Sequence, residues 1–86
     1  MILRMRKRSS LSPREIQCLK TFGARVRAAR ASKGWTLEEA EARGWNSWQH
    51  LQQIESGGKN INFTTLLRLL RLLELDPTRT LGDLKP

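Results

Sequence analysis

Polar residues that begin helices recur along this sequence, and they constrain its fold more than any other feature. Ser12 precedes Pro13 and stands three residues before Glu15, a pattern that caps a helix and places proline at its first position. Other hydroxyl and amide residues precede the later helical patterns: Thr36, Ser47 and Asn62. Asp76-Pro77 must end the last long pattern, because proline breaks a helix. The sequence therefore predicts an all-α fold of five helices joined by short loops, without strands.

The first helical pattern contains one interruption. Apolar residues recur at helical spacing from Ile16 to Ala29, and Lys33-Gly34 ends the pattern. Gly23 lies inside it and disfavours a helix by about 1 kcal/mol relative to alanine. The stretch is therefore either one helix or two.

The size and charge of the chain limit its function. Its 86 residues make one small domain. Sixteen lysines and arginines against eight acids give a net charge of +8, which favours a polyanionic partner, nucleic acid before an acidic membrane surface. No apolar run is long enough to span a bilayer, so no membrane-spanning segment is expected, and nucleic acid rather than a membrane is the expected partner. The single cysteine, Cys18, cannot form an internal disulfide and suits a cytoplasmic protein.

Basic residues are concentrated at the start of the chain, at Arg4, Arg6, Lys7 and Arg8. We expect residues 1–11 to form a basic flexible arm and residues 12–86 to form the folded domain. A functional arm would follow a nucleic-acid backbone or enter a minor groove. The alternative is an ordinary solvated tail.

From Phe22 to Leu81 the order of these signals resembles the phage repressor/Cro-type helix-turn-helix domain, also called the XRE type. Four segments carry the resemblance: Phe22-Gly23 with Arg25, Val26, Arg27 and Arg30; Thr36-Leu37-Glu38-Glu39; Ser47 to Gly57; and Asn62 to Leu67. Their order and spacing together make it specific. The resemblance implies a five-helix, lambda-repressor-like fold whose helix-turn-helix motif covers about residues 36–56.

The resemblance also implies one ion pair. In this family the acid that ends the third helix pairs with an arginine of the first helix, and Glu55 and Arg30 occupy these positions. A bidentate guanidinium–carboxylate pair would tie the reading helix to the rest of the domain. The alternative is a solvent-screened ion pair, which contributes only about 0–1 kcal/mol.

Members of this family read bases with residues at the start and middle of the third helix. In this sequence those positions hold Trp48, Gln49, Gln52 and Gln53, and a glutamine amide can bond adenine N6 and N7 together. Trp48 would either touch the DNA or pack back onto the domain. Contacts to the DNA backbone are expected from five further residues: Thr36, Arg43, Ser47, Lys59 and Asn60. No cofactor or metal is expected, because the lone His50 has no Cys/His cluster around it.

The second helix fits the family in either of two registers. In the first, Glu41 would lie in the interior, which is unfavourable for a charge without a partner. The second removes one residue from the helix and lengthens the turn. Ala40 then takes the buried position, Gly44 lies in the turn and Trp45 fills the core. We prefer the second register because it removes the charge from the interior.

The fourth helix carries leucine on almost every side. Four residues are expected to cover the core: Phe63, Leu66, Leu70 and Leu73. Leu69 and Leu72 would then form a second apolar face, which favours a two-fold dimer on paired DNA half-sites. The alternative is that Leu81 and Leu84 fold back and cover this face within one subunit.

These features favour a sequence-specific transcriptional regulator that binds double-stranded DNA as a dimer, as a small repressor does. The alternative is a protein–protein interaction module that uses Trp45, Trp48 and the glutamine face. Four acids near the motif favour this alternative, because they weaken the attraction of phosphate: Glu38, Glu39, Glu41 and Glu55. An enzyme is not expected, since there is no catalytic triad, no paired carboxylates at a plausible cleft and no glycine-rich phosphate loop.

Overall fold

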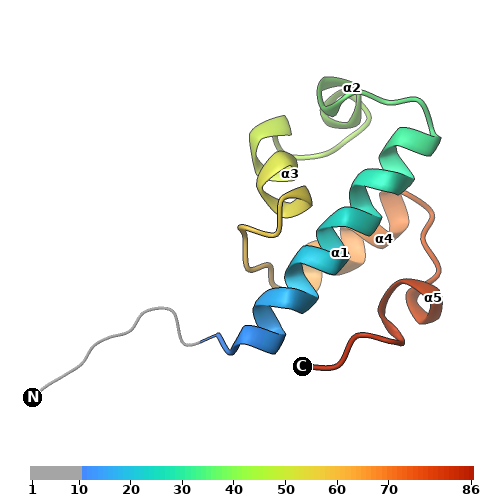
Figure 1. Ribbon diagram of the computed structural model, residues 1–86. Helices are drawn as coiled ribbons and strands as arrows, with labels where there is room; N and C mark the ends of the chain where they lie inside the picture. The colour runs from blue at the N-terminus through green and yellow to red at the C-terminus, as the bar shows by residue number, and fades with distance from the viewer. Residues whose placement is uncertain (1–10) are drawn as a thin grey trace, which may run out of the picture.

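The structure is a computed structural model that describes residues 11–86, and this part of the chain folds into helices and loops only. The helices are α1 (Pro13–Ser32), α2 (Leu37–Ala42), α3 (Trp48–Glu55), α4 (Phe63–Leu72) and α5 (Pro77–Leu81) (Figure 1). The predicted all-α fold with five helices is confirmed. The four basic residues of the expected arm lie outside the described residues.

The helix starts follow the polar residues that predicted them. Ser12 and Glu15 form a capping box, in which the Glu15 backbone N–H donates to the Ser12 hydroxyl at 3.1 Å and the Ser12 N–H donates to the Glu15 carboxylate at 2.7 Å. Thr36 and Glu39 repeat this arrangement at the start of α2. A single side-chain oxygen caps α3 and α4, from Ser47 and Asn62 respectively. The bonds satisfy backbone donors that would otherwise have no partner.

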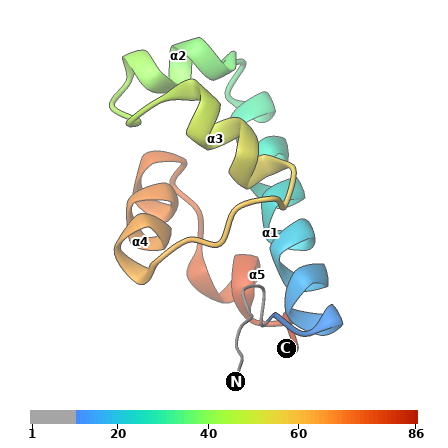
Figure 2. The same cartoon turned by 90° about the vertical axis from the view of Figure 1, so that its left-hand side faces the viewer.

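The helices enclose one small core. Figure 2 shows α1 and α4 on opposite sides of the domain, with α3 crossing above and α5 below. The C-terminus of the chain lies beside the start of α1. Buried side chains of α1, α2, α3, the turn between α2 and α3, and the α4 region meet between them: Phe22, Val26, Ala40, Trp45, Leu51, Ile54, Leu69 and Leu73. Leu81 of α5 packs against this core. The C-terminal segment is fixed to α1 by Arg25, whose guanidinium donates to the Thr80 carbonyl at 2.8 Å and to both carboxylate oxygens of Asp83.

Gly23 does not divide the first helix, because α1 is continuous from Pro13 to Ser32. The residue is buried where α1 meets the end of α3. A β-carbon at this position would overlap the Ile54 carbonyl oxygen and would lie 2.7 Å from the Glu55 carbonyl oxygen. The glycine therefore allows the two helix backbones to approach each other more closely than any side chain would permit.

The second helix adopts the preferred register. Ala40 is completely buried, Gly44 has a φ of +124° in the turn, and Trp45 is only 6% exposed. Glu41 lies on the surface. The backbone N–H of Trp45 donates to the Ala40 carbonyl at 3.1 Å, which closes the turn over the core. The register that removes the acid from the interior is confirmed.

The inward face of α4 differs from the expected one. Phe63 was expected in the core, but it is 70% exposed at the first position of the helix. Leu69 was expected in a dimer interface, and this is wrong because its side chain is 0% exposed. Leu72 is partly buried and packs against the core. The face that meets the core is Leu66, Leu69, Leu70 and Leu73, which have the usual spacing of one helix side.

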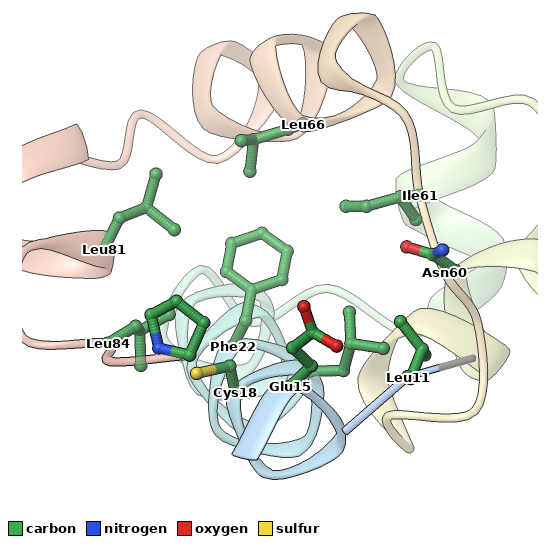
Figure 3. Close-up of a pocket in the computed structure, with 11 residues that line it drawn as sticks. Leu11, Glu15, Cys18, Phe22, Asn60, Ile61, Leu66, Leu81 and Leu84 are labelled. Atoms are coloured by element: carbon green, nitrogen blue, oxygen red, sulfur yellow. The ribbon is translucent and has the colours of Figure 1, made fainter. Parts of the chain in front are cut away.

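An open apolar pocket of about 290 Å³ remains between α1, α4 and the C-terminal segment. Figure 3 shows Phe22 at its centre, with Leu66 on one side and Leu81 and Leu84 on another. Cys18 also lines it and is a partly buried free thiol rather than a fully buried one. The C-terminal leucines thus pack against the core without closing it.

We expect Gly23→Ala to destabilise the domain, although alanine favours a helix by about 1 kcal/mol. The added methyl group must separate α1 from α3, and overpacking of this kind costs about 1–3 kcal/mol. Chemical denaturation measures the change. The control is Ala24→Gly at the neighbouring exposed position, which reports helix propensity alone. A Gly23→Ala protein as stable as the parent would contradict the close approach.

Candidate nucleic-acid interface

One face of α3 is buried and the other is open to solvent. The helix begins at Ser47, whose hydroxyl accepts from the His50 backbone N–H at 3.0 Å. Leu51 and Ile54 point into the core and are almost completely buried. Three residues on the outer side are exposed: Gln49, Gln52 and Gln53. The helix therefore presents a row of amide groups, each with donors and an acceptor.

A bidentate ion pair connects the end of α3 to α1. Arg30 Nε lies 2.7 Å from Glu55 Oε2, and Arg30 Nη2 lies 2.9 Å from Glu55 Oε1. Arg30 also donates to the Trp35 carbonyl at 2.7 Å, just before α2. The two charged side chains are 14% and 6% exposed, and the hydrogen bond to Glu55 raises the pKa of Arg30. The pair therefore fixes α3 against α1 and also fixes the chain that leads into α2.

A shallow hollow beside this pair brings α1, α2 and α3 together. Its volume is about 260 Å³, and its lining includes Arg27, Leu37, Gln52 and Ser56. Arg27 is exposed and was not expected at the interface from the sequence. Its position three residues before Arg30 is the signal that could have identified it, because residues at this spacing share one side of a helix.

The start of α3 is held by an acid of α2. The backbone N–H of Trp48 donates to the Glu41 carboxylate at 2.8 Å, a bond that the sequence did not suggest. Trp48 is partly buried, and His50 stacks on Trp45 with a ring-centroid distance of 5.9 Å. Two of the N–H groups at this helix start, those of Trp48 and His50, are therefore already bonded within the domain.

A family model described as helix-turn-helix matches residues 26–79, which is well over half of the chain. The chain belongs to the XRE-type helix-turn-helix family. This family is one of DNA-binding regulatory domains and not of enzymes, and it suggests a DNA-binding transcription regulator. No match was found among curated proteins, and none was found among solved structures. No helix among residues 11–86 is long and apolar enough to cross a membrane.

The helix-turn-helix domain distributes the expected DNA-backbone residues over separate places. Thr36 is exposed at the start of α2, and Lys59 and Asn60 are exposed in the segment between α3 and α4. Ser47 is partly buried and is used as the cap of α3. Arg43 lies at the other end of α2 from Thr36, where its guanidinium stacks over the Trp35 ring at 4.6 Å. The Arg43 side chain thus reaches back to the residue that precedes Thr36 and is already engaged in a contact within the domain.

We expect Arg30→Ala to lower the melting temperature of the domain more than Arg25→Ala does. Removing Arg30 leaves the Glu55 carboxylate buried without its partner. For buried pairs of this kind, such a change lowers the free energy of unfolding by about 3 kcal/mol. Arg25 pairs with an exposed carboxylate that water can solvate after the change. Circular dichroism melts of the two variants make the comparison. Equal melting temperatures would show that the buried pair does not hold the helices together.

Proposed function

We propose that this domain is a sequence-specific, double-stranded DNA-binding regulator that acts as a small repressor. The observation that supports this is the exposed amide row of α3, on a helix held in place by the Arg30–Glu55 pair. A helix of this kind fits the major groove, where base edges can be read. Occupying a site in this way blocks polymerase without any chemical step.

The glutamines have the chemistry for base reading. The amide of Gln49 or Gln53 can donate to adenine N7 and accept from its N6 amino group, and a pair of bonds of this type gives about 1–3 kcal/mol of discrimination. Trp48 stands beside them and can contact a thymine methyl group with its exposed part. We assign sequence preference to these residues and to Gln52.

Contacts to phosphate would come from residues around the amide row. Arg27 lies on one side of it, in the hollow that Gln52 also lines, and Lys59 and Asn60 follow α3 in the chain. Thr36 places the start of α2 at the surface. Such contacts release counterions from DNA, so the affinity should fall steeply as the salt concentration rises.

A dimer would place two reading helices on paired half-sites about 34–36 Å apart. Since Leu69 is buried, we place the dimer surface on Phe63 and Leu67, the two large apolar residues of α4 that remain exposed. They stand four residues apart and so share one side of the helix. Burial of the exposed phenylalanine side chain in the interface would stabilise the dimer by about 1.5–3 kcal/mol.

We expect Gln49→Ala to reduce the difference in affinity between preferred and altered DNA sequences. Lys59→Ala and Arg27→Ala should weaken binding to all sequences alike. Each change should reduce the slope of the logarithm of the affinity against the logarithm of the salt concentration by about 1. A preferred duplex is first selected from a random pool, and fluorescence anisotropy then gives affinities at several salt concentrations. The proposal fails if the parent protein prefers no duplex over random competitor.

The same measurements address the alternative of a protein-interaction module. Trp45 is buried, so such a module would have to use Trp48 and the glutamines alone. Changes at Trp48 and Gln49 that leave DNA binding intact and abolish a protein complex would favour it. A DNA site with two-fold symmetry would instead favour the dimeric repressor.

We expect Phe63→Asp to dissociate the dimer while the fold is retained, because the side chain is largely exposed within one subunit. Thr64→Asp introduces the same charge at the next position, on a different side of α4, and should leave the dimer intact. Sedimentation analysis measures the two association constants. A parent protein that is monomeric on its selected DNA would rule out this surface.

A further inference from the structure

A second pocket lies on the side of the domain, between the turn that joins α2 to α3 and the C-terminal half of α4. Its volume is about 540 Å³, and the residues that matter here are Arg43, Trp45, Asn46, Arg68 and Arg71. Figure 2 shows this turn close to the end of α4, at the upper left of the view. We call it the lateral arginine pocket. It does not include the glutamines of α3.

The lateral arginine pocket concentrates positive charge without a carboxylate in its lining. Among residues 11–86, the ion pairs of the structure involve Arg25, Arg30 and Lys33, and none uses an arginine of this pocket. Arg68 and Arg71 lie three residues apart on α4, and like charges at this spacing destabilise each other. Glu39 interacts electrostatically with Arg43, but its carboxylate accepts from the Thr36 backbone N–H and lies outside the pocket lining. A bound anion would relieve the repulsion between the arginines.

One lining residue of the pocket, Trp45, has a buried donor with no partner among residues 11–86, and Nδ1 of its stacking neighbour His50 is also buried and unpaired there. The indole Nε1 of Trp45 is buried and makes no hydrogen bond within the described part of the chain. An indole N–H and a guanidinium can only donate, and Asn46 is the one lining side chain that can also accept. A lining of this kind selects a ligand that mainly accepts hydrogen bonds.

We propose that the lateral arginine pocket binds the phosphate groups of a small phosphorylated molecule. Guanidinium groups match phosphate oxygens with paired hydrogen bonds, which favours phosphate over a single carboxylate. The volume exceeds that of one phosphate ion and falls within the range of small-molecule sites, about 300–1,000 Å³. A ligand with two linked phosphates can contact arginines from both walls at once. Its binding does not depend on the DNA-binding function proposed above.

The stacking of Arg43 on Trp35 supports this assignment. The contact holds one guanidinium in place before any ligand arrives, which reduces the entropy lost on binding. The opposite wall belongs to α4, so a bound ligand would connect α4 to the turn that leads into α3. Binding would therefore be coupled to the position of the start of the reading helix, and any effect on DNA affinity must be reciprocal.

The probe for this proposal is inorganic pyrophosphate. Two-dimensional NMR resolves the indole N–H signals of the three tryptophans, and Trp45→Phe assigns the relevant one. We expect pyrophosphate to shift the Trp45 signal saturably in the full chain. The double variant Arg68→Gln/Arg71→Gln should weaken this binding by roughly tenfold or more, since each charge-assisted bond contributes about one factor of ten.

The matched control is Arg14→Gln/Arg79→Gln, which removes the same charge from two exposed positions outside the pocket. Its dissociation constant for pyrophosphate should lie within about twofold of the parent value, because salt screens charges that are distant from the pocket. Equal weakening in both double variants, or no shift of the Trp45 signal with any phosphate, would overturn the proposal.

The phosphate bound in this pocket could belong either to a free molecule or to the DNA backbone. Titration of the protein with duplex DNA distinguishes the two sources. A Trp45 signal that shifts with pyrophosphate alone supports the free ligand. A signal that shifts with duplex DNA and not with pyrophosphate assigns the phosphate to the DNA backbone and overturns the small-molecule part. Failure of sequence-specific DNA binding would leave the pyrophosphate result unaffected, so the two proposals fail separately.

Discussion

The bidentate pair between Arg30 and Glu55 is the interaction on which the rest of the structure depends. An isolated helix as short as α3 is not stable in water, because the nucleation of a helix is unfavourable. Its geometry must therefore come from tertiary contacts. The pair supplies two of these hydrogen bonds, and the absence of a side chain at Gly23 lets the backbones meet at the same end of the helix. Because a buried ion pair adds little net stability, its main effect here is to fix orientation.

Contacts that fix the orientation of helices also explain why a strongly basic domain carries four acids around its motif. Glu55 is paired with Arg30, Glu39 accepts from the Thr36 N–H, and Glu41 accepts from the Trp48 N–H. The hydrogen bonds to Thr36 lower the pKa of Glu39, as expected of a carboxylate at a helix start. Among the contacts within residues 11–86, Glu38 is the one of these four acids without a hydrogen bond of this kind. The acids thus build the motif, and the surrounding basic residues remain available for phosphate.

The sequence predicted local structure well because caps and turns depend on neighbouring residues. The caps at Ser12, Thr36, Ser47 and Asn62 all occur, and the unfavourable burial of Glu41 was enough to choose the register of α2. Packing between distant segments was less predictable. Leucines surround α4 almost completely, so its periodicity does not say which side meets the core, and Leu69 and Phe63 were assigned to the wrong sides.

Other features could not be seen because they depend on close approach of distant residues. Glycine is required at position 23 because the backbone at the end of α3 lies directly against α1. The sequence alone indicates only that glycine disfavours a helix at this position. The spacing of Arg27 from Arg30 places it on the same side of α1, but only the fold shows that Gln52 lines the same hollow. The motif in the sequence proposes candidates for base reading on α3, whereas the residues beside them become visible only through the packing of α1 against α3.

The two ends of α3 are held differently, and this difference bears on how the domain would recognise DNA. The C-terminal end is fixed by the buried pair with Arg30 and by direct backbone packing. The N-terminal end is held by the Ser47 cap, by the stacking of His50 on Trp45, by the bond from the Trp48 N–H to Glu41 and by a turn that contains Gly44. The bond to Glu41 is exposed, so water competes with it. Trp48 and Gln49, the residues that we propose for base reading, stand at this end of α3, so their position depends on the turn and on the contacts of Ser47, Glu41 and Trp45 rather than on the buried ion pair.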